Sequence, residues 1–358
     1  MRFAIKTRPE HTPWGRIRDV WLAADEISLF ESAWNWDHFY PLTGDLTGPN
    51  LEAWTMLAAL GQATRRIRIG CQVTGMIYRH PAVLANMAAT TDIICGGRLE
   101  LGLGAGWNQM ECDAYGIDLP PLRERLDRFD EGVEAIARLL SQETTTLNGT
   151  YVRLTEARCE PKPVQRPHPP ITVGGRGKSR TLRTAARWAQ QWNAITSDPQ
   201  DWLDLAGTLR SHCADLGRDP AEITCSVNVR IEDGTGIGQA AELAAAYREA
   251  GVDLAIVNLP LSADSGLLAP LAAALEPLAG SSSPWAGRQA RFSTSRNSST
   301  PWSCVVTKPA KLGLGMSQSA NVTGIEPETR IWVAVRCALR LNVTGRVWPC
   351  SVRFPVAW

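Results

Sequence analysis

A short polar segment, Trp36-Asp37-His38-Phe39, follows an apolar stretch that reads as a β-strand. Histidine changes its charge near neutral pH, so His38 at a strand end could give or take a proton during a reaction. Asp37 beside it could orient the imidazole or charge it. A histidine that only satisfies a structural hydrogen bond is the competing interpretation. The segment makes His38 and Asp37 the candidate catalytic residues.

Two glycine-containing segments could lie against a flat ring system. One is Val73-Thr74-Gly75, and the other, residues 101–108, reads Leu-Gly-Leu-Gly-Ala-Gly-Trp-Asn. Glycine at a strand end permits the close approach of a ligand. The second segment is no dinucleotide fingerprint, because Trp107 stands where the third glycine would be. We expect a floor of small residues with Asn108 as a polar contact. The alternatives are tight barrel packing and, at Gly75, a plain turn.

A third glycine-containing segment, Val173-Gly174-Gly175-Arg176-Gly177-Lys178-Ser179-Arg180, leads into an expected helix. Backbone N–H groups at the start of a helix point toward bound anions. Lys178, Ser179 and Arg180 could reinforce that attraction. The segment predicts a phosphate cradle, and a flexible turn with a solvated basic face is the alternative.

Composition argues against several other chemistries. The 358 residues include 37 Lys+Arg and 36 Asp+Glu, without the basic excess of a nucleic-acid binder. The five histidines are not clustered with carboxylates as a metal site requires, and no GxSxG motif occurs. No apolar run reaches the ~18 residues of a membrane span, and the start lacks a secretory signal. We therefore expect no metal, no nucleic acid, no membrane contact and a cytoplasmic location.

Strand-like runs and helical patterns alternate over residues 1–280. Such repetition predicts parallel strands joined by helices. Eight units in this length fit a closed (β/α)₈ barrel, which typically takes ~250 residues, and an open doubly wound sheet is the competitor. In a barrel the carboxyl ends of the strands meet at one face, which would bring the candidate segments together. The expected strands are 2–7, 32–36, 67–73, 99–104, 170–173, 192–196, 223–230 and 252–258, and the expected helices are 19–24, 54–60, 81–94, 122–140, 179–189, 202–216, 239–250 and 266–278.

Two regions stand apart from this repeat. Residues 142–169 form a long connection that predicts a β-hairpin, 144–147 with 151–154, around an Asn-Gly turn. Residues 281–358 hold 10 Lys+Arg against 2 Asp+Glu, whereas residues 1–280 hold 27 against 34. We interpret 1–280 as the catalytic barrel and 281–358 as a separate basic tail. This tail is disordered, the product of a shifted reading frame, or a basic binding arm.

Taken together, the strand ends resemble the luciferase-like monooxygenase superfamily, and more closely its actinobacterial branch that uses the deazaflavin coenzyme F420. The resemblance covers about residues 1–280, and the tail lies outside it. It rests on the order and spacing of several blocks, which are 32–39, 68–75, 78–82, 96–108, 161–165 and 171–175.

The resemblance implies a TIM barrel with insertions, a ring system bound at its carboxyl-terminal mouth and a phosphate near the fifth strand. It implies His38 as the proton-transfer residue and a non-proline cis peptide near Thr74-Gly75. The residues expected to contact the cofactor are Trp36, Thr74, Gly75, Gly106, Asn108, Gly174, Gly175 and Ser179.

The implied activity is F420-dependent hydride transfer to or from a small organic substrate. An FMN-dependent monooxygenase that uses reduced FMN and oxygen is the alternative, and it would need a flavin reductase as partner. A second alternative is an inactive barrel that only binds. Members of the superfamily commonly dimerise through barrel helices, so a homodimer is a further hypothesis.

Overall fold

The computed structural model describes residues 1–231, 236–280, 333–336 and 351–354. By contacts, the chain divides into two units, Met1–Ser298 and Ser299–Trp358. In the second unit, β12 (Val333–Arg336) pairs antiparallel with β13 (Ser351–Phe354). The other residues of the expected tail lie outside the described residues, so its disorder and the boundary at residue 280 stay predictions.

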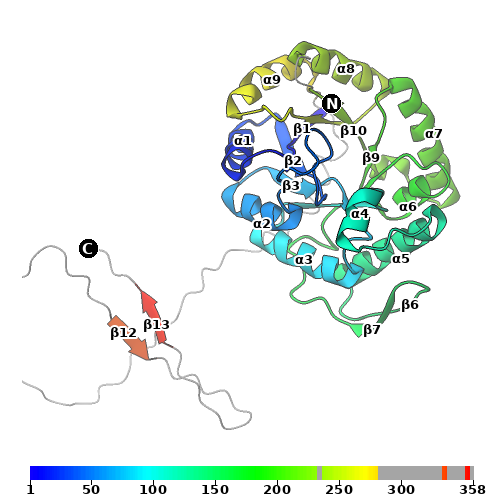
Figure 1. The fold of residues 1–358 in the computed structure, drawn as a ribbon. Helices are drawn as coiled ribbons and strands as arrows, with labels where there is room; N and C mark the ends of the chain where they lie inside the picture. The colour runs from blue at the N-terminus through cyan, green and yellow to red at the C-terminus, as the bar shows by residue number, and fades with distance from the viewer. Residues whose placement is uncertain (232–235, 281–332, 337–350, 355–358) are drawn as a thin grey trace, which may run out of the picture. The chain divides into compact units, whose positions relative to one another are not determined.

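The first unit is a closed barrel of parallel strands surrounded by helices (Figure 1). The sheet runs from β3 through β2, β1 and β11 round to β8 and β5, and it closes into a ring because β3 also pairs with β5. This ring confirms the expected (β/α)₈ barrel and excludes the open sheet. Its strands are β1 (Arg2–Lys6), β2 (Phe30–Asn35), β3 (Arg68–Cys71), β4 (Thr74–Gly75), β5 (Leu99–Gly104), β8 (Ile171–Gly174), β9 (Gln191–Ala194), β10 (Thr224–Arg230) and β11 (Leu254–Asn258).

The helices pack their apolar faces on the outside of the strands (Figure 1). Along α5, for example, buried positions recur at helical spacing from Phe129 through Val133 and Ile136 to Leu140. The helices are α1 (Trp14–Glu26), α2 (Ala53–Ala63), α3 (Pro81–Ile94), α4 (Gln109–Tyr115), α5 (Leu122–Ser141), α6 (Thr181–Trp188), α7 (Pro199–Asp215), α8 (Ile237–Ala250) and α9 (Leu268–Leu275). No helix among the described residues is long and apolar enough to span a membrane.

Two helices differ from the sequence expectation. Helix α1 begins at Trp14 rather than near residue 19, directly after Pro13, whose backbone is extended. Helix α4 was not expected, because its seven residues carry no apolar stripe that a pattern could reveal. It ends at Gly116, which takes the left-handed conformation (φ 65°) that glycine adopts readily.

The predicted hairpin is present as β6 (Thr145–Asn148) and β7 (Arg153–Ala157). Glu131 of α5 fixes its turn, accepting hydrogen bonds from the backbone amides of Thr150, Tyr151 and Val152 at 2.8–2.9 Å. The insertion is therefore attached to the barrel through α5.

Alternation along the strands separates the barrel interior from the helix-facing core. Phe3 and Ile5 of β1 pack in the core beneath the helices, whereas Ala4 packs with Trp34, Leu254 and Ile256 in a small second cluster. Because side chains alternate with a period of two, Lys6 shares the interior side with Ala4. The polar residues at the carboxyl ends of the strands are held by this scaffold.

Candidate active site

A buried hydrogen-bonded triad lies where β2 and β5 end. The His38 Nδ1 atom is 2.6 Å from Oε1 of Glu111 in α4, and Tyr78 Oη donates to the same oxygen. The other oxygen, Oε2, accepts from the Phe39 backbone amide at 2.8 Å. Glu111 is fully buried and His38 is 9% exposed. The imidazole is therefore held in a fixed position at the barrel mouth.

The carboxylate of Glu111 is held in its ionised form. Burial on its own would raise its pKa, but hydrogen bonds from His38, Tyr78 and the Phe39 amide outweigh burial and lower the pKa. Burial, followed by the bond to Glu111, raises the pKa of Tyr78, which keeps the phenol protonated as a donor. An ionised acceptor at Nδ1 fixes a proton on that atom, so Nε2 is left to exchange a proton.

Asp37 does not take the orienting role expected from the sequence. It is almost fully buried and pairs with Arg79, whose Nη2 lies 3.2 Å from Asp37 Oδ1. Arg79 Nη2 also donates to Glu52 Oε1 at 2.7 Å. Burial raises the pKa of Asp37 despite this arginine. Glu111, distant in sequence, holds the histidine in place of its chain neighbour.

Aromatic side chains flank His38 on two sides. The Trp36 ring lies 6.3 Å from the imidazole centroid and the Trp107 ring lies 5.5 Å from it, both nearly edge-on. Trp107 is 62% exposed although it is large and apolar. Thr74 is buried behind this group and accepts a hydrogen bond from Trp54 Nε1 at 2.9 Å. The two indoles thus place apolar side chains directly beside the His38 imidazole.

The glycines at the mouth stand where no side chain fits. A Cβ on Gly75 would lie 2.7 Å from the Tyr78 ring, and one on Gly174 would lie 2.9 Å from Val73 Cγ1. Gly106 has a φ of 85° and would meet Ile77. The expected cis peptide is present but lies between Gln72 and Val73, not at Thr74-Gly75. Side chains of the segment between β3 and α3 thus pack directly against the glycines of this segment, of β8 and of the loop after β5.

Asn108 stands between Gly106 and Glu111 at the start of α4. It is 7% exposed and is the residue before the first turn of the helix, without a side-chain cap bond to it. Its place beside the triad agrees with the expected polar contact, which stays a prediction.

The segment between β8 and α6 is the predicted phosphate-binding segment. It contains fewer unpaired cationic side chains than the sequence suggested. Gly175 has a φ of 140° and Ser179 is exposed. Arg180 is paired with Asp127 at 2.6 Å and Asp130 at 2.8 Å, and Arg176 is paired with Asp201 at 3.0 Å. Phosphate binding here would rest on backbone amides, Ser179 and Lys178.

Buried polar atoms without partners collect around the mouth. Unpaired buried polar groups are costly, so such atoms mark places where a ligand completes the hydrogen bonding. A ring with alternating carbonyl and N–H groups offers both donors and acceptors to such a set. Twelve buried side-chain atoms lack a hydrogen-bond partner within the described residues, and five of them are Trp36 Nε1, Gln72 Nε2, Thr172 Oγ1, Asn228 Oδ1 and Asn258 Oδ1.

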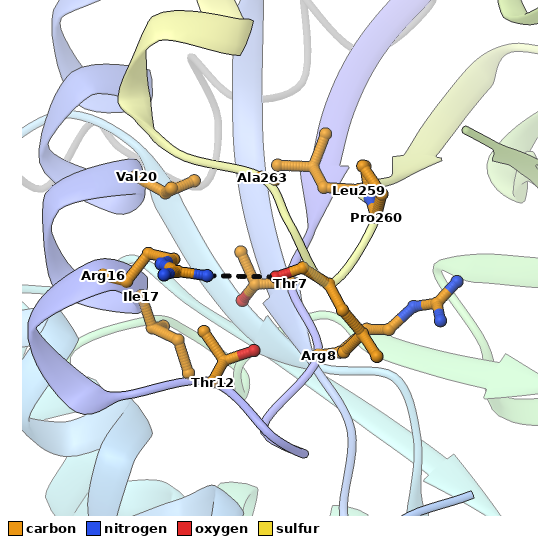
Figure 2. Close-up of a pocket in the computed structure, with 10 residues that line it drawn as sticks. Thr7, Arg8, Thr12, Arg16, Ile17, Val20, Leu259, Pro260 and Ala263 are labelled. Carbon is orange, nitrogen blue, oxygen red and sulfur yellow. Dashed lines mark hydrogen bonds between the residues drawn. The ribbon is translucent and has the colours of Figure 1, made fainter. Parts of the chain in front are cut away.

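Two cavities differ in what they could hold. A cavity of about 760 Å³ lies at the ends of β9 and β10, lined by Arg176, Asn228 and Arg230 among others. A second, between α1 and the segment after β11, measures about 10 Å³ and has room for about one water. Figure 2 shows Arg16, Ile17 and Val20 of α1 at this second cavity. Arg16 Nη1 donates to the Leu261 carbonyl, 3.5 Å away. Of these two, the first is large enough for a small-molecule substrate.

Sequence reasoning missed Glu111, Tyr78 and Lys6. Glu111 lies in a helix without a periodic signal, 73 residues from His38 along the chain. Tyr78 occurs in a quoted block, but nothing in that block indicated an acidic partner. Lys6 is the last residue of an apolar strand. A lysine in that position lies at the mouth of the barrel, and this position could have marked Lys6 as a candidate site residue.

A family model described as luciferase-like monooxygenase matches residues 1–292. An F420-dependent glucose-6-phosphate dehydrogenase from Microbacterium testaceum is 30% identical over 235 residues, which are 64% of this chain and 68% of that protein. An F420-dependent hydroxymycolic acid dehydrogenase from Mycobacterium tuberculosis is 35% identical over 205 residues, 56% of this chain and 54% of that protein. An uncharacterised M. tuberculosis protein is 34% identical over 186 residues, half of this chain and 64% of that relative's length.

The fold is also similar to solved structures. That of an F420-dependent secondary alcohol dehydrogenase, in complex with an F420-acetone adduct, has a TM-score of 0.67. At 19% identity it covers 74% of this chain and 95% of that chain. At this level of identity the likeness shows the barrel fold.

Proposed function

We propose that this protein, which belongs to the luciferase-like monooxygenase family, is an oxidoreductase that uses coenzyme F420 to interconvert an alcohol and a carbonyl compound. The observation that carries the proposal is the His38–Glu111 pair, 2.6 Å apart and nine-tenths or more buried. Relatives that match through the same barrel are named as F420-dependent dehydrogenases, which supports the cofactor.

The residues present fit such a cofactor. Its ring would lie near Trp36, Thr74, Gly75, Gly106 and Asn108, where the buried Trp36 Nε1 lacks a hydrogen-bond partner among the described residues. Its phosphate would be held at Gly174, Gly175 and Ser179. When bound, coenzyme F420 would exchange a hydride with the substrate carbon.

The chain's own residues handle the proton that accompanies this hydride. In alcohol oxidation, Nε2 of His38 accepts the hydroxyl proton, and in carbonyl reduction it returns a proton to the oxygen. Glu111 holds Nδ1–H and stabilises the imidazolium that forms. Trp107 and Trp36 flank His38 and would keep water from the reacting atoms. Asp37, through Arg79, fixes the segment that carries His38.

The test is turnover by the full-length protein with a panel of primary and secondary alcohols and oxidised coenzyme F420. The reverse reaction is tested with carbonyl compounds and the reduced coenzyme. We expect oxygen-independent turnover that His38→Gln lowers about a thousandfold while the folded state is retained. Turnover only with reduced FMN and oxygen would replace the proposal with a monooxygenase. A homodimer stays a prediction that sedimentation of the same sample tests.

A further inference from the structure

The last interior position on three neighbouring strands carries Lys6, Asn258 and Arg230. In the parallel ladders, Asn258 of β11 is opposite Lys6 of β1 and also opposite Arg230 of β10. Residues in register on neighbouring strands share one face. Ile256, two residues before Asn258, packs in the barrel interior with Ala4, two residues before Lys6. All three side chains therefore start from the interior at the mouth.

The charge of Lys6 has no acidic counterpart. Lys6 is 7% exposed, and its Nζ donates to the Gln72 carbonyl at 2.7 Å and to Gln72 Oε1 at 3.1 Å. Both acceptors are neutral, and an ammonium has three N–H donors. No carboxylate forms an ion pair with Lys6 within the described part of the chain. Burial, with smaller contributions from Arg230 and Arg8, lowers the pKa of Lys6 to about 7.

Arg230 is the second cation without a partner among the described residues, and its side chain is exposed. It lines the 760 Å³ cavity, where Arg176 is already paired with Asp201 at 3.0 Å. The Asp198 carboxylate in this cavity accepts from the Gln200 amide at 2.9 Å, at the N-terminus of α7. Among the described residues, Arg230 has no ion pair. The cavity is thus lined by one arginine that has no ion pair among the described residues. Lys6 does not line the cavity; it lies two strands away in the ladder, across Asn258.

Asn258 lies between the two cations and lacks a donor. Its Oδ1 is buried without a hydrogen-bond partner among the described residues. A ligand with an anionic group and an adjacent hydroxyl would supply counter-charge to both cations and a donor to this oxygen.

We propose that Lys6 and Arg230 bind an anionic group of the substrate, a carboxylate or a phosphate. The substrate is then a hydroxylated compound, or the corresponding carbonyl compound, with an anion at one end. This inference rests on the proposed function and names the substrate class for the same site.

The distance to His38 suits a compact substrate. The Trp36 ring lies 5.5 Å from Lys6 Nζ and 6.3 Å from the His38 ring centroid. A single indole therefore separates the anion site from the proton-exchanging histidine. A molecule of a few carbons that is anchored by its anion reaches His38 with its other end. Such anchoring supplies the fixed orientation on which transfer reactions depend.

The cofactor's phosphate is the other source of an anion, but it is expected on β8, at Gly174 and Gly175. The two cations come from β1 and β10. Arg230 shares its cavity with Arg176 of the β8–α6 segment, but Arg176 is already paired with Asp201 at 3.0 Å. We therefore assign Lys6 and Arg230 to the substrate.

The test is anion binding by the full-length protein without cofactor, measured by calorimetry. Inorganic phosphate and acetate are the probes, and chloride at matched ionic strength is the reference. We expect saturable binding that Lys6→Met and Arg230→Gln each weaken about tenfold, as for loss of one charge-assisted hydrogen bond. The matched control, Arg176→Gln, removes a paired arginine from the same cavity and should change binding less than twofold. Arg230→Lys should restore most of it, which separates charge from structure, and circular dichroism confirms folding.

Three outcomes overturn the proposal. The first is no saturable binding of either probe to the unmodified protein. The second is binding that persists in Lys6→Met and Arg230→Gln but is lost in Gly175→Asp, which places the anion on the β8 segment. The third is loss of phosphate binding at saturating coenzyme F420, which assigns the cations to the cofactor. Because the main assay contains no cofactor, its failure is distinguishable from failure of the proposed function.

Discussion

The two sides of the barrel mouth differ in how completely their polar groups are paired. On the side of β2 and α4, His38, Tyr78 and the Phe39 amide all bond to Glu111. On the side of β1, β11 and β10, Lys6 has only neutral acceptors and Asn258 Oδ1 has none. The paired side is organised by the chain's own residues. Under our proposals the unpaired side is completed by the substrate, so that the paired side is the catalytic machinery and the unpaired side is the recognition surface.

Among the substitutions considered, the largest loss of activity is expected for His38, on the paired side of the mouth. His38→Gln removes the proton-exchanging nitrogen but keeps a side chain of similar length. We expect kcat with coenzyme F420 to fall about a thousandfold, within the 10²–10⁴ range of lost acid–base catalysis. Cofactor affinity, measured by fluorescence titration, should change little. A variant that keeps more than a tenth of the activity would remove His38 from the mechanism.

Glu111→Gln tests whether the carboxylate positions the histidine. The amide retains an acceptor for the Phe39 amide but cannot stabilise an imidazolium. We expect kcat to fall about a hundredfold, as for a misplaced catalytic group, with KM nearly unchanged. Glu111→Asp should recover part of the loss. An equal rise in KM would instead indicate a general structural role.

Lys6→Met tests the unpaired side through the pH dependence of the free energy of unfolding. Burial lowers the pKa of Lys6 from 10.5 to about 7, so between these values the unfolded chain binds more protons than the folded chain. The free energy of unfolding therefore rises with pH across that window. Its slope is at most the value for a difference of one bound proton between the unfolded and folded chains. Lys6→Met should flatten this rise without lowering stability at pH 7. Urea unfolding at pH 7, 8.5 and 10 measures it, and an unchanged slope would show that Lys6 titrates normally.

The smallest effects come from single polar groups. Tyr78→Phe removes a donor from Glu111 and should lower the free energy of unfolding by about 1 kcal/mol. Asn258→Leu replaces an unpartnered amide at similar volume and should leave stability unchanged or raise it by about 1 kcal/mol. Urea unfolding of both variants at pH 7 compares them directly. If both lose the same amount, the contrast between the two sides does not hold.

The sequence predicted the barrel well because its strands and helices have clear periods. The run Leu99–Gly104 and the helix Pro81–Ile94 match the structure residue for residue. Pairings across the barrel carry no local signal, so the partner of His38 was placed one residue away, at Asp37, instead of at Glu111. The cis peptide was predicted near Thr74-Gly75 but lies two residues earlier, between Gln72 and Val73. The end of a short strand is difficult to locate from sequence to within two residues.

The charges of the β8–α6 segment illustrate the same limit. Lys178, Ser179 and Arg180 read as one basic group beside the glycines. In the structure Arg180 turns to Asp127 and Asp130 of α5, which no spacing in the segment indicates. Recognition of residue types located the site, and only the packed structure showed which charges are free.

The most direct test of the central claim is titration of the full-length protein with oxidised coenzyme F420 and, separately, with FMN. The signal is tryptophan fluorescence, because Trp36 and Trp107 flank His38. The account predicts saturable micromolar binding of coenzyme F420, much tighter than that of FMN and weakened by Gly175→Asp. Preferential FMN binding would point to a monooxygenase. Binding of neither by the folded protein would contradict the catalytic assignment and favour an inactive barrel.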